Sequence, residues 1–189
     1  IREDINFWQP GGNAAFKIIA SGTPFVFKLK APINSIGGIG FFSSHTFLPL
    51  SMAWEVFGEG NGCNTYNQLQ KMILPLKKDK TDLNPRIGCF VLTNPIFFKK
   101  EEWIPTPEDW STSIVQGKSY STDTEIGERL WNKIEHLLRR YLYSTPDEEK
   151  SKLILEEPVA MYGNSILRKV GLGQGAFRVL VTDDYYINI

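Results

Sequence analysis

The residues from Gly22 to Phe42, GTPFVFKLKAPINSIGGIGFF, constrain the fold of this chain most strongly, because they combine two strand patterns with a turn. In the first part, Phe25 and Phe27 alternate with positions that include Lys28 and Lys30. A period of two places successive side chains on opposite faces of a strand. The pattern therefore predicts a half-buried strand with its phenylalanines inward and its lysines outward.

A turn and a glycine-rich strand pattern follow. Ala31 to Ser35 contains Pro32 and Asn34, residue types that favour turns. Ile36 to Phe42 then reads IGGIGFF, and glycine inside a strand marks a bulge, a sharp bend or a surface that a backbone or ligand approaches. Two interpretations stay open, a barrel corner without a ligand and a corner that a ligand also approaches. Both bend the sheet.

Composition limits the partners of the chain. It has 189 residues, of which 42% are hydrophobic, enough for one domain with a buried core. Lys+Arg and Asp+Glu both number 21, so the formal net charge is zero. A chain without net positive charge has no global field that attracts nucleic acid. Any nucleic-acid partner must therefore bind a local patch.

Signals for metals, membranes and export are weak. Cys63 and Cys89 form no C-x-x-C pair, and the two histidines are His45 and His136. This disfavours a structural zinc site, and Cys89, inside an apolar run, is predicted to be an inert core thiol. The sequence has no signal peptide or long apolar span, so we expect a cytoplasmic protein without membrane contact. Because the chain begins at Ile1 rather than at a start residue, we expect a fragment of a longer protein.

Helix patterns interrupt the strands. Ser51 is predicted to cap a short helix that ends at Phe57, and Thr65 begins a capping box for a second helix. Thr122 is predicted to cap one long helix. The long helix has an apolar stripe at every fourth position, formed by Ile126, Leu130, Ile134 and Leu138.

Further strands are expected after residue 86. Residues 87–93 and 95–98 are predicted as strands that break at Asn94 and Pro95, and residues 177–181 alternate in the manner of another strand. Two polar segments leave alternatives open. Residues 77–86 are either a surface loop or a phosphate-contacting patch. Residues 103–120 are either a loop across a barrel mouth or a wall of a binding pocket.

Three groups of long and distinctive segments resemble segments of a known protein family. They are NFWQPGG with PFVFKLKAPINSIGGIGFF and LPLSMAWEVFG, IGCFVLTNPIFF with EEWIPTPEDWSTSIVQGKSY, and GLGQGAFRVLVTDDYY. These segments resemble a family of bacterial HNH restriction endonucleases, in which an N-terminal domain precedes an HNH nuclease module. That N-terminal domain is similar to the PUA superfamily, which includes the SRA and EVE readers of modified bases.

The resemblance implies an α+β fold, a PUA/SRA-like twisted β-barrel with flanking helices. It implies a DNA-recognition domain over residues 1–157 and, over residues 158–189, a junction leading into an HNH module that lies outside this chain. The partner implied is double-stranded DNA with a modified base, which some such readers flip into an aromatic pocket. A homodimer is expected by analogy, because HNH enzymes often cut both strands as dimers.

The chain departs from the family pattern at its end. In the family, the GQGAFR segment leads into a nuclease whose histidines activate water on a metal. Here the chain ends at Ile189, and no such histidines follow Tyr186. We therefore expect no catalytic residues and no cofactor in this chain, and a divalent metal only in the nuclease module.

Candidate recognition residues follow from what a flipped base requires, namely a flat stacking partner and side-chain donors or acceptors for its edge. The predicted base pocket comprises Trp8, Asn94, Trp110, Ser111, Gln116 and Tyr120. The predicted contacts to the DNA backbone are Lys28, Lys30, Lys118, Arg168, Lys169 and Arg178. Each has a plainer interpretation, since tryptophans also fill cores and single lysines on strands are usually solvated.

Two other functions stay open. An RNA-binding PUA-type module would use the same barrel and the same aromatic residues. A hydrolase would use Asp183 and Asp184 with a metal, but adjacent carboxylates on a strand point to opposite faces and make a poor joint site.

Overall fold

The computed structural model describes residues 4–11, 20–111, 113–114, 117–143 and 175–182. The strands in this part of the chain are β1 (Ile5–Gln9), β2 (Pro24–Leu29), β3 (Ser35–Pro49), β4 (Arg86–Phe97), β5 (Ile104–Pro105), β6 (Gly117–Ser121) and β7 (Ala176–Thr182). The α-helices are α1 (Leu50–Phe57), α2 (Tyr66–Ile73) and α3 (Glu125–Tyr143), and the 3-10 helices are η1 (Gly58–Asn61), η2 (Leu74–Leu76) and η3 (Lys100–Glu102).

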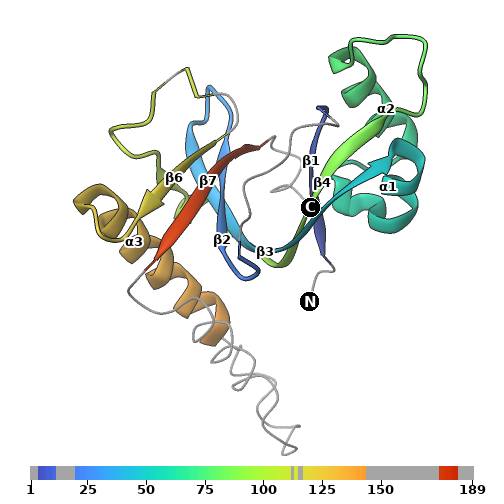
Figure 1. The fold of residues 1–189 in the computed structure, drawn as a ribbon. Coiled ribbons are helices and arrows are strands. Elements are labelled where there is room, and N and C mark those ends of the chain that lie inside the picture. Colours follow the sequence, from blue (N-terminus) through green and yellow to red (C-terminus); the bar gives the residue numbers. More distant parts are fainter. Residues whose placement is uncertain (1–3, 12–19, 112, 115–116, 144–174, 183–189) are drawn as a thin grey trace, which may run out of the picture.

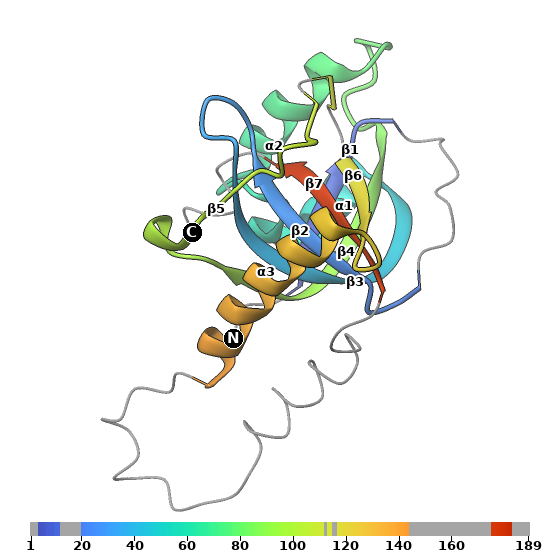
Figure 2. The ribbon, with the colours of Figure 1, turned by 90° about the vertical axis from the view of Figure 1, so that its left-hand side faces the viewer.

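The described strands form one mixed, seven-stranded sheet in the order β1-β4-β3-β2-β7-β6 (Figure 1), with β5 paired to the start of β3 (Figure 2). The β2–β7 pair is parallel and the other pairs are antiparallel. The predicted α+β class is confirmed. The predicted turn is confirmed too, since residues 30–34 join β2 to β3 with Asn34 at φ 48° and a cis bond before Pro32.

The predicted closed barrel is wrong for the residues that the structure describes. Among the described strands, β1 and β6 are the two edges of the sheet, each paired on one side only. The physical reason is that helices, not opposite strands, cover the outer faces. α3 packs on the β2–β7–β6 half, and α1 and α2 pack on the β3–β4 half (Figures 1 and 2). The sheet is therefore bent but open.

The core has three parts. The α3 cluster joins the stripe of α3 to Val26, Ile39 and Phe177. The phenylalanine cluster lies on the opposite face of the sheet, and the α1–α2 cluster lies beneath the first two helices. The members of the phenylalanine cluster include Phe25, Phe27, Phe42, Phe90, Leu92 and Leu180. The predicted apolar stripe of the long helix is thus confirmed as core.

The central strand differs from its prediction. All six residues of β2 are buried, because β2 lies between β3 and β7 and both of its faces are covered. Val26 faces the α3 cluster, while Phe25 and Phe27 face the phenylalanine cluster. Lys28 is only 4% exposed. The prediction of a half-buried strand with an outward lysine edge is therefore wrong at Lys28.

The glycines of β3 allow the sheet to bend around a phenylalanine. A Cβ atom on Gly38 would lie 2.7 Å from the Ile96 carbonyl oxygen and 3.0 Å from the Phe27 ring, and one on Gly40 would lie 3.0 Å from the same ring. The β2–β3 register shifts between Phe27 and Lys28, and the β3–β4 register shifts across Gly40 and again between Phe42 and Ser44. The close approach at these glycines is made by the chain itself, which supports the corner interpretation.

β4 continues through the predicted break. Ile39 pairs with Ile96 and Phe41 pairs with Thr93, so two β4 residues, Asn94 and Pro95, lie opposite Gly40 alone. This is a β-bulge, which tolerates a proline because the extra residue does not contribute to the ladder. The bulge turns Asn94 to φ 50° without ending the strand.

The helix caps were predicted in part. The Thr65 hydroxyl accepts a hydrogen bond from the Gln68 amide at 3.2 Å, as predicted. The Ser51 hydroxyl does not cap α1; instead, the Ser51 amide donates to Asn84 Oδ1 at 2.8 Å. For α3, Thr124 rather than Thr122 caps the helix, accepting from the Gly127 amide at 3.2 Å.

Candidate functional site

Four of the predicted recognition residues lie close together around an acidic residue. We use the name Asp109 cluster for Asp109 together with Lys28, Trp110, Lys118 and Tyr120. The two lysines and the tyrosine come from β2 and β6, while the aspartate and the tryptophan lie in the irregular segment after β5. Residues separated by up to about ninety positions in the sequence thus meet at one place on the α3 side of the sheet.

Asp109 holds two members of the cluster directly. The Tyr120 hydroxyl donates to Asp109 Oδ1 at 2.8 Å, and the Lys118 ammonium forms an ion pair with Asp109 Oδ2. Lys118 Nζ also lies 4.9 Å from the centre of the Tyr120 ring. Burial raises the pKa of the Asp109 carboxyl, but the hydrogen bonds from Lys118 and Tyr120 outweigh burial, and the pKa is lowered. Asp109 is therefore a carboxylate at neutral pH.

Tyr120 is a core residue with a polar tip. Its side chain is 5% exposed, and its ring stacks on Phe177 at 5.9 Å between centroids. Burial, followed by the hydrogen bond to Asp109, raises the pKa of the Tyr120 hydroxyl. The ring therefore supports the cluster from below and offers no free face for a ligand in this conformation.

Lys28 is a buried cation with neutral partners. Its ammonium donates to the Leu29 carbonyl at 2.9 Å and to Asn34 Oδ1 at 2.8 Å, and it lies 5.5 Å from the centre of the Trp110 ring. Burial lowers the pKa of this amine. Among the described residues, no carboxylate pairs with it. Its charge is offset by oxygen dipoles and by the face of an indole ring.

Trp110 is half-buried, between the two extremes that the sequence left open. It packs against the α3 cluster, and its amide donates to the Pro107 carbonyl at 3.0 Å, which fixes the turn before it. The next residue, Ser111, is exposed and shares a hydrogen bond of 2.8 Å with Ser113. Within the Asp109 cluster, the indole is the aromatic ring with an accessible part.

The other predicted residues lie elsewhere. The Trp8 indole donates to the Asn61 carbonyl at 3.0 Å and packs against the α1–α2 cluster. Asn94 occupies the bulge of β4, Lys30 is exposed after β2, and Arg178 is half-buried in β7, where burial lowers its pKa. The residues outside the described part of the chain are Gln116, Arg168, Lys169, Asp183 and Asp184.

Sequence reasoning missed Asp109 and Asn34, the two residues that orient the lysines. Asp109 lies nine residues before Lys118 in an irregular segment, a spacing that no helix or strand period relates. Asn34 was predicted as a turn residue only, yet its amide oxygen also accepts from Lys28. No local pattern identifies either role.

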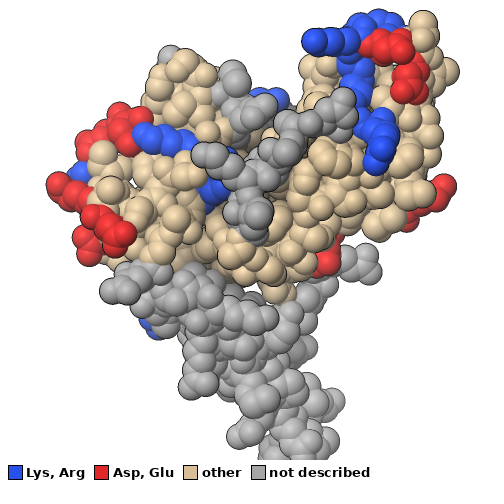
Figure 3. All heavy atoms as spheres, viewed as in Figure 1, with Lys and Arg blue, Asp and Glu red and all other residues tan. Residues whose placement is uncertain are grey.

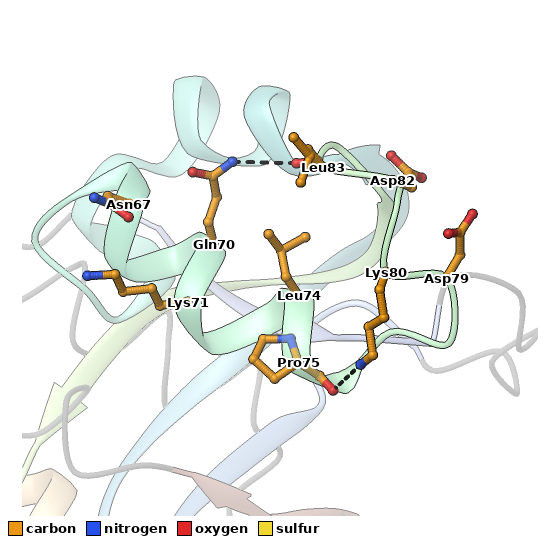
Figure 4. Close-up of a pocket in the computed structure, with 9 residues that line it drawn as sticks. All are labelled: Asn67, Gln70, Lys71, Leu74, Pro75, Asp79, Lys80, Asp82 and Leu83. Atoms are coloured by element: carbon orange, nitrogen blue, oxygen red, sulfur yellow. Dashed lines mark hydrogen bonds between the residues drawn. The ribbon is translucent and has the colours of Figure 1, made fainter.

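A broad hollow lies at the far side of the molecule, between α2 and the loop that leads to β4 (Figure 4). Its volume is about 700 Å³. Lys80 donates to the Pro75 carbonyl at 2.7 Å and Gln70 to the Leu83 carbonyl at 3.4 Å, which ties the loop to the helix. The residues lining the hollow are Asn67, Gln70, Lys71, Leu74, Pro75, Asp79, Lys80, Asp82 and Leu83.

Neither cysteine has the character of a nucleophile. Burial raises the pKa of the Cys63 thiol to about 11 and also raises that of Cys89. Both thiols are therefore protonated at neutral pH, and the predicted inert character of Cys89 is supported.

No three His, Cys, Asp or Glu side chains of the described residues converge in a way that could hold a metal ion. The helices that the structure describes include none with the length and apolar character needed to cross a membrane.

Together, these features define an α+β protein with an open mixed sheet and the Asp109 cluster on one side of it. Comparison of the chain with protein-family models, with curated proteins and with solved structures finds no significant match. Its function is therefore inferred from its own residues.

Proposed function

We propose that this chain is the DNA-recognition domain of a modification-dependent HNH restriction endonuclease, a PUA-superfamily-like reader that binds a modified base in duplex DNA. The observation that supports the proposal is the Asp109 cluster. It brings Lys28 of β2 next to a half-buried tryptophan, and it pairs Lys118 of β6 with Asp109, the residue before that tryptophan. A flat ring beside cations is the combination that binds an unstacked base and its phosphate.

In this proposal, Trp110 stacks on the flipped base. The ring is held by Lys28 at 5.5 Å and by the turn that begins at Pro107, so it loses little freedom when a base binds. Stacking of a base on an aromatic side chain contributes about 1–3 kcal/mol, and extrusion costs a few kcal/mol. Stacking alone therefore offsets only part of the extrusion cost, and further contacts must read the base.

Two further contacts are proposed, one from Lys118 to the DNA backbone and one from Gln116 to the base. Lys118 exchanges Asp109 for a DNA phosphate, because its side chain is 30% exposed and its ion pair lies at the surface. Gln116 bonds the base edge, an assignment made from sequence alone. Cleavage belongs to the separate HNH module with its divalent metal, in the bacterial cytoplasm, and a homodimer places one recognition domain on each side of the target.

The test is a set of binding titrations with one duplex in several forms: unmodified, with methylated or hydroxymethylated cytosine, and with methylated adenine. The variant Trp110→Leu should lose roughly tenfold or more in affinity for the preferred form and little for the unmodified duplex. The matched control is Trp54→Leu, which removes another half-buried tryptophan, in α1. Equal affinity for all duplex forms contradicts the proposal, and tighter binding to RNA than to every duplex would favour an RNA-binding module.

A further inference from the structure

The charges of this neutral chain are distributed unevenly. Residues 71–86 contain five Lys or Arg and two Asp residues, whereas residues 101–135 contain eight Asp or Glu and three Lys or Arg. In Figure 3, blue side chains lie beside a smaller red group at the α2 end of the molecule, and the side on which α3 lies shows mostly red side chains with some blue. Residues 71–86 therefore carry a local excess of positive charge of the kind that a polyanion requires.

Lys71, Lys78 and Lys80 are the exposed lysines of this patch, and we call them the lysine rim. All three are exposed, and within the described part of the chain none pairs with a carboxylate. Lys71 and Lys80 border the hollow of about 700 Å³, whose apolar lining includes Leu74 and Pro75 (Figure 4). Lysines around an apolar floor fit the phosphates and sugars of a nucleic-acid backbone.

The acidic residues of the loop are engaged in shaping it. Asp79 Oδ1 accepts from the amide and hydroxyl of Thr81 at 2.8 and 2.7 Å, and Asp82 Oδ1 accepts from the Asn84 amide at 2.9 Å. These bonds hold the loop in one conformation, and those from Thr81 lower the pKa of the Asp79 carboxyl. The carboxylates thus serve the turn and do not pair with the lysine rim.

The loop is also anchored to the sheet. Lys77 Nζ donates to the Arg86 carbonyl at 2.6 Å and to the Pro10 carbonyl, and Asn84 accepts from the Ser51 amide. Pro85 is buried at the end of the loop. The lysine rim is therefore carried on a fixed support, which lowers the entropy lost on binding a rigid polyanion.

We infer that the lysine rim and the hollow between α2 and residues 77–85 bind the phosphate backbone of duplex DNA, independently of its sequence. This inference rests on the proposed function for its choice of partner. It adds a second contact, remote from the Asp109 cluster, that supplies affinity and positions the duplex while the cluster supplies selectivity. The partner is a regular double helix, because the rim is a fixed array of cations without aromatic rings on which single-stranded bases could stack.

The test is the salt dependence of duplex binding, measured by fluorescence anisotropy on the whole chain. The triple variant Lys71→Gln, Lys78→Gln, Lys80→Gln should bind a labelled duplex of about 20 base pairs at least roughly tenfold more weakly at low salt. The slope of log affinity against log salt should become less negative by as much as about 2.7, or about 0.9 for each phosphate that the variant no longer neutralises. The preference among modified duplexes should not change.

The matched control changes the same net charge elsewhere. It is Lys99→Gln, Lys100→Gln, Lys133→Gln, three exposed lysines in and beside η3 and in α3. An unchanged slope in the rim variant, or an equal decrease in affinity in the control, overturns the inference. The inference is also overturned if the rim variant binds single-stranded RNA or polyglutamate more weakly than the wild type does but binds duplex DNA with unchanged affinity.

The two proposals fail in distinguishable ways. Duplex binding that depends on the lysine rim but shows no preference for a modified base contradicts the reader proposal alone. A modification preference with an unchanged salt slope in the rim variant contradicts the lysine rim alone.

Discussion

The Lys28 ammonium lies 5.5 Å from the centre of the Trp110 ring, although the two residues are far apart in the chain and only one belongs to a strand. The contact joins the middle of the sheet to the irregular segment after β5. It stabilises a lysine that is 4% exposed and has neutral oxygen partners. The energetics of this buried cation can be measured directly.

Replacing Lys28 with methionine should change how stability depends on pH. Burial lowers the pKa of the Lys28 amine from its ordinary value of 10.5, so the folded state releases this proton at a lower pH than the unfolded state does. The unfolded state then binds more protons between the two pKa values, and the free energy of unfolding rises with pH in that window. We expect the wild type to gain stability relative to Lys28→Met as the pH rises toward 10.5, measured in urea titrations. A constant difference between the two proteins would contradict a lowered pKa.

The hydrogen bond between Tyr120 and Asp109 should appear as a coupling energy. Tyr120→Phe should lower the free energy of unfolding by about 1 kcal/mol at neutral pH, because the bond joins a buried hydroxyl to a carboxylate that is partly exposed. A double-mutant cycle with Asp109→Ala, which removes the acceptor, should return most of that energy as coupling. Tyr66→Phe, a change in α2, should show no coupling to Asp109→Ala.

Asn61 should be more important to stability than its polar character suggests. It is fully buried in η1, where its amide donates to the carbonyls of Ala53 and Gly58 at 3.1 and 2.8 Å and its Oδ1 accepts from Asn6 at 2.9 Å. Asn61→Ala removes these three hydrogen bonds from a buried site and should lower the free energy of unfolding by about 2–4 kcal/mol. Chemical denaturation measures the decrease. Asn67→Ala, at an exposed position of α2, should change stability by less than about 0.5 kcal/mol.

Gly38 should not tolerate a methyl group. Its Cβ atom would lie 2.7 Å from the Ile96 carbonyl oxygen, so Gly38→Ala must push β4 away from β3. We expect the free energy of unfolding to fall by about 1–3 kcal/mol in thermal or chemical denaturation. Gly11→Ala is the matched control, since no atom lies within 4 Å of its Cβ position. Similar effects of the two variants would show that the bend of β3 does not need glycine.

Local sequence patterns predicted the features that depend on near neighbours in the chain. Pro32 and Asn34 predicted the β2–β3 turn, Thr65 predicted the cap of α2, and a fourfold spacing predicted the buried stripe of α3. Each of these follows from contacts within a few residues or from the period of one element. The bend at Gly38 was predicted for the same reason, although the ring that requires it was not.

The tertiary arrangement determines which surfaces meet. It placed β7 beside β2 in parallel, covered both faces of β2 and so buried Lys28, and left the sheet open between β1 and β6. It also brought Asp109 to Lys118 and Tyr120. The period of a strand predicts on which face of the sheet a residue lies, but it does not predict what covers that face. The neighbour of β2 in the sheet, β7, lies more than a hundred residues away in the sequence. Burial, and with it the pKa values and partners of the lysines, is therefore a property of the whole fold.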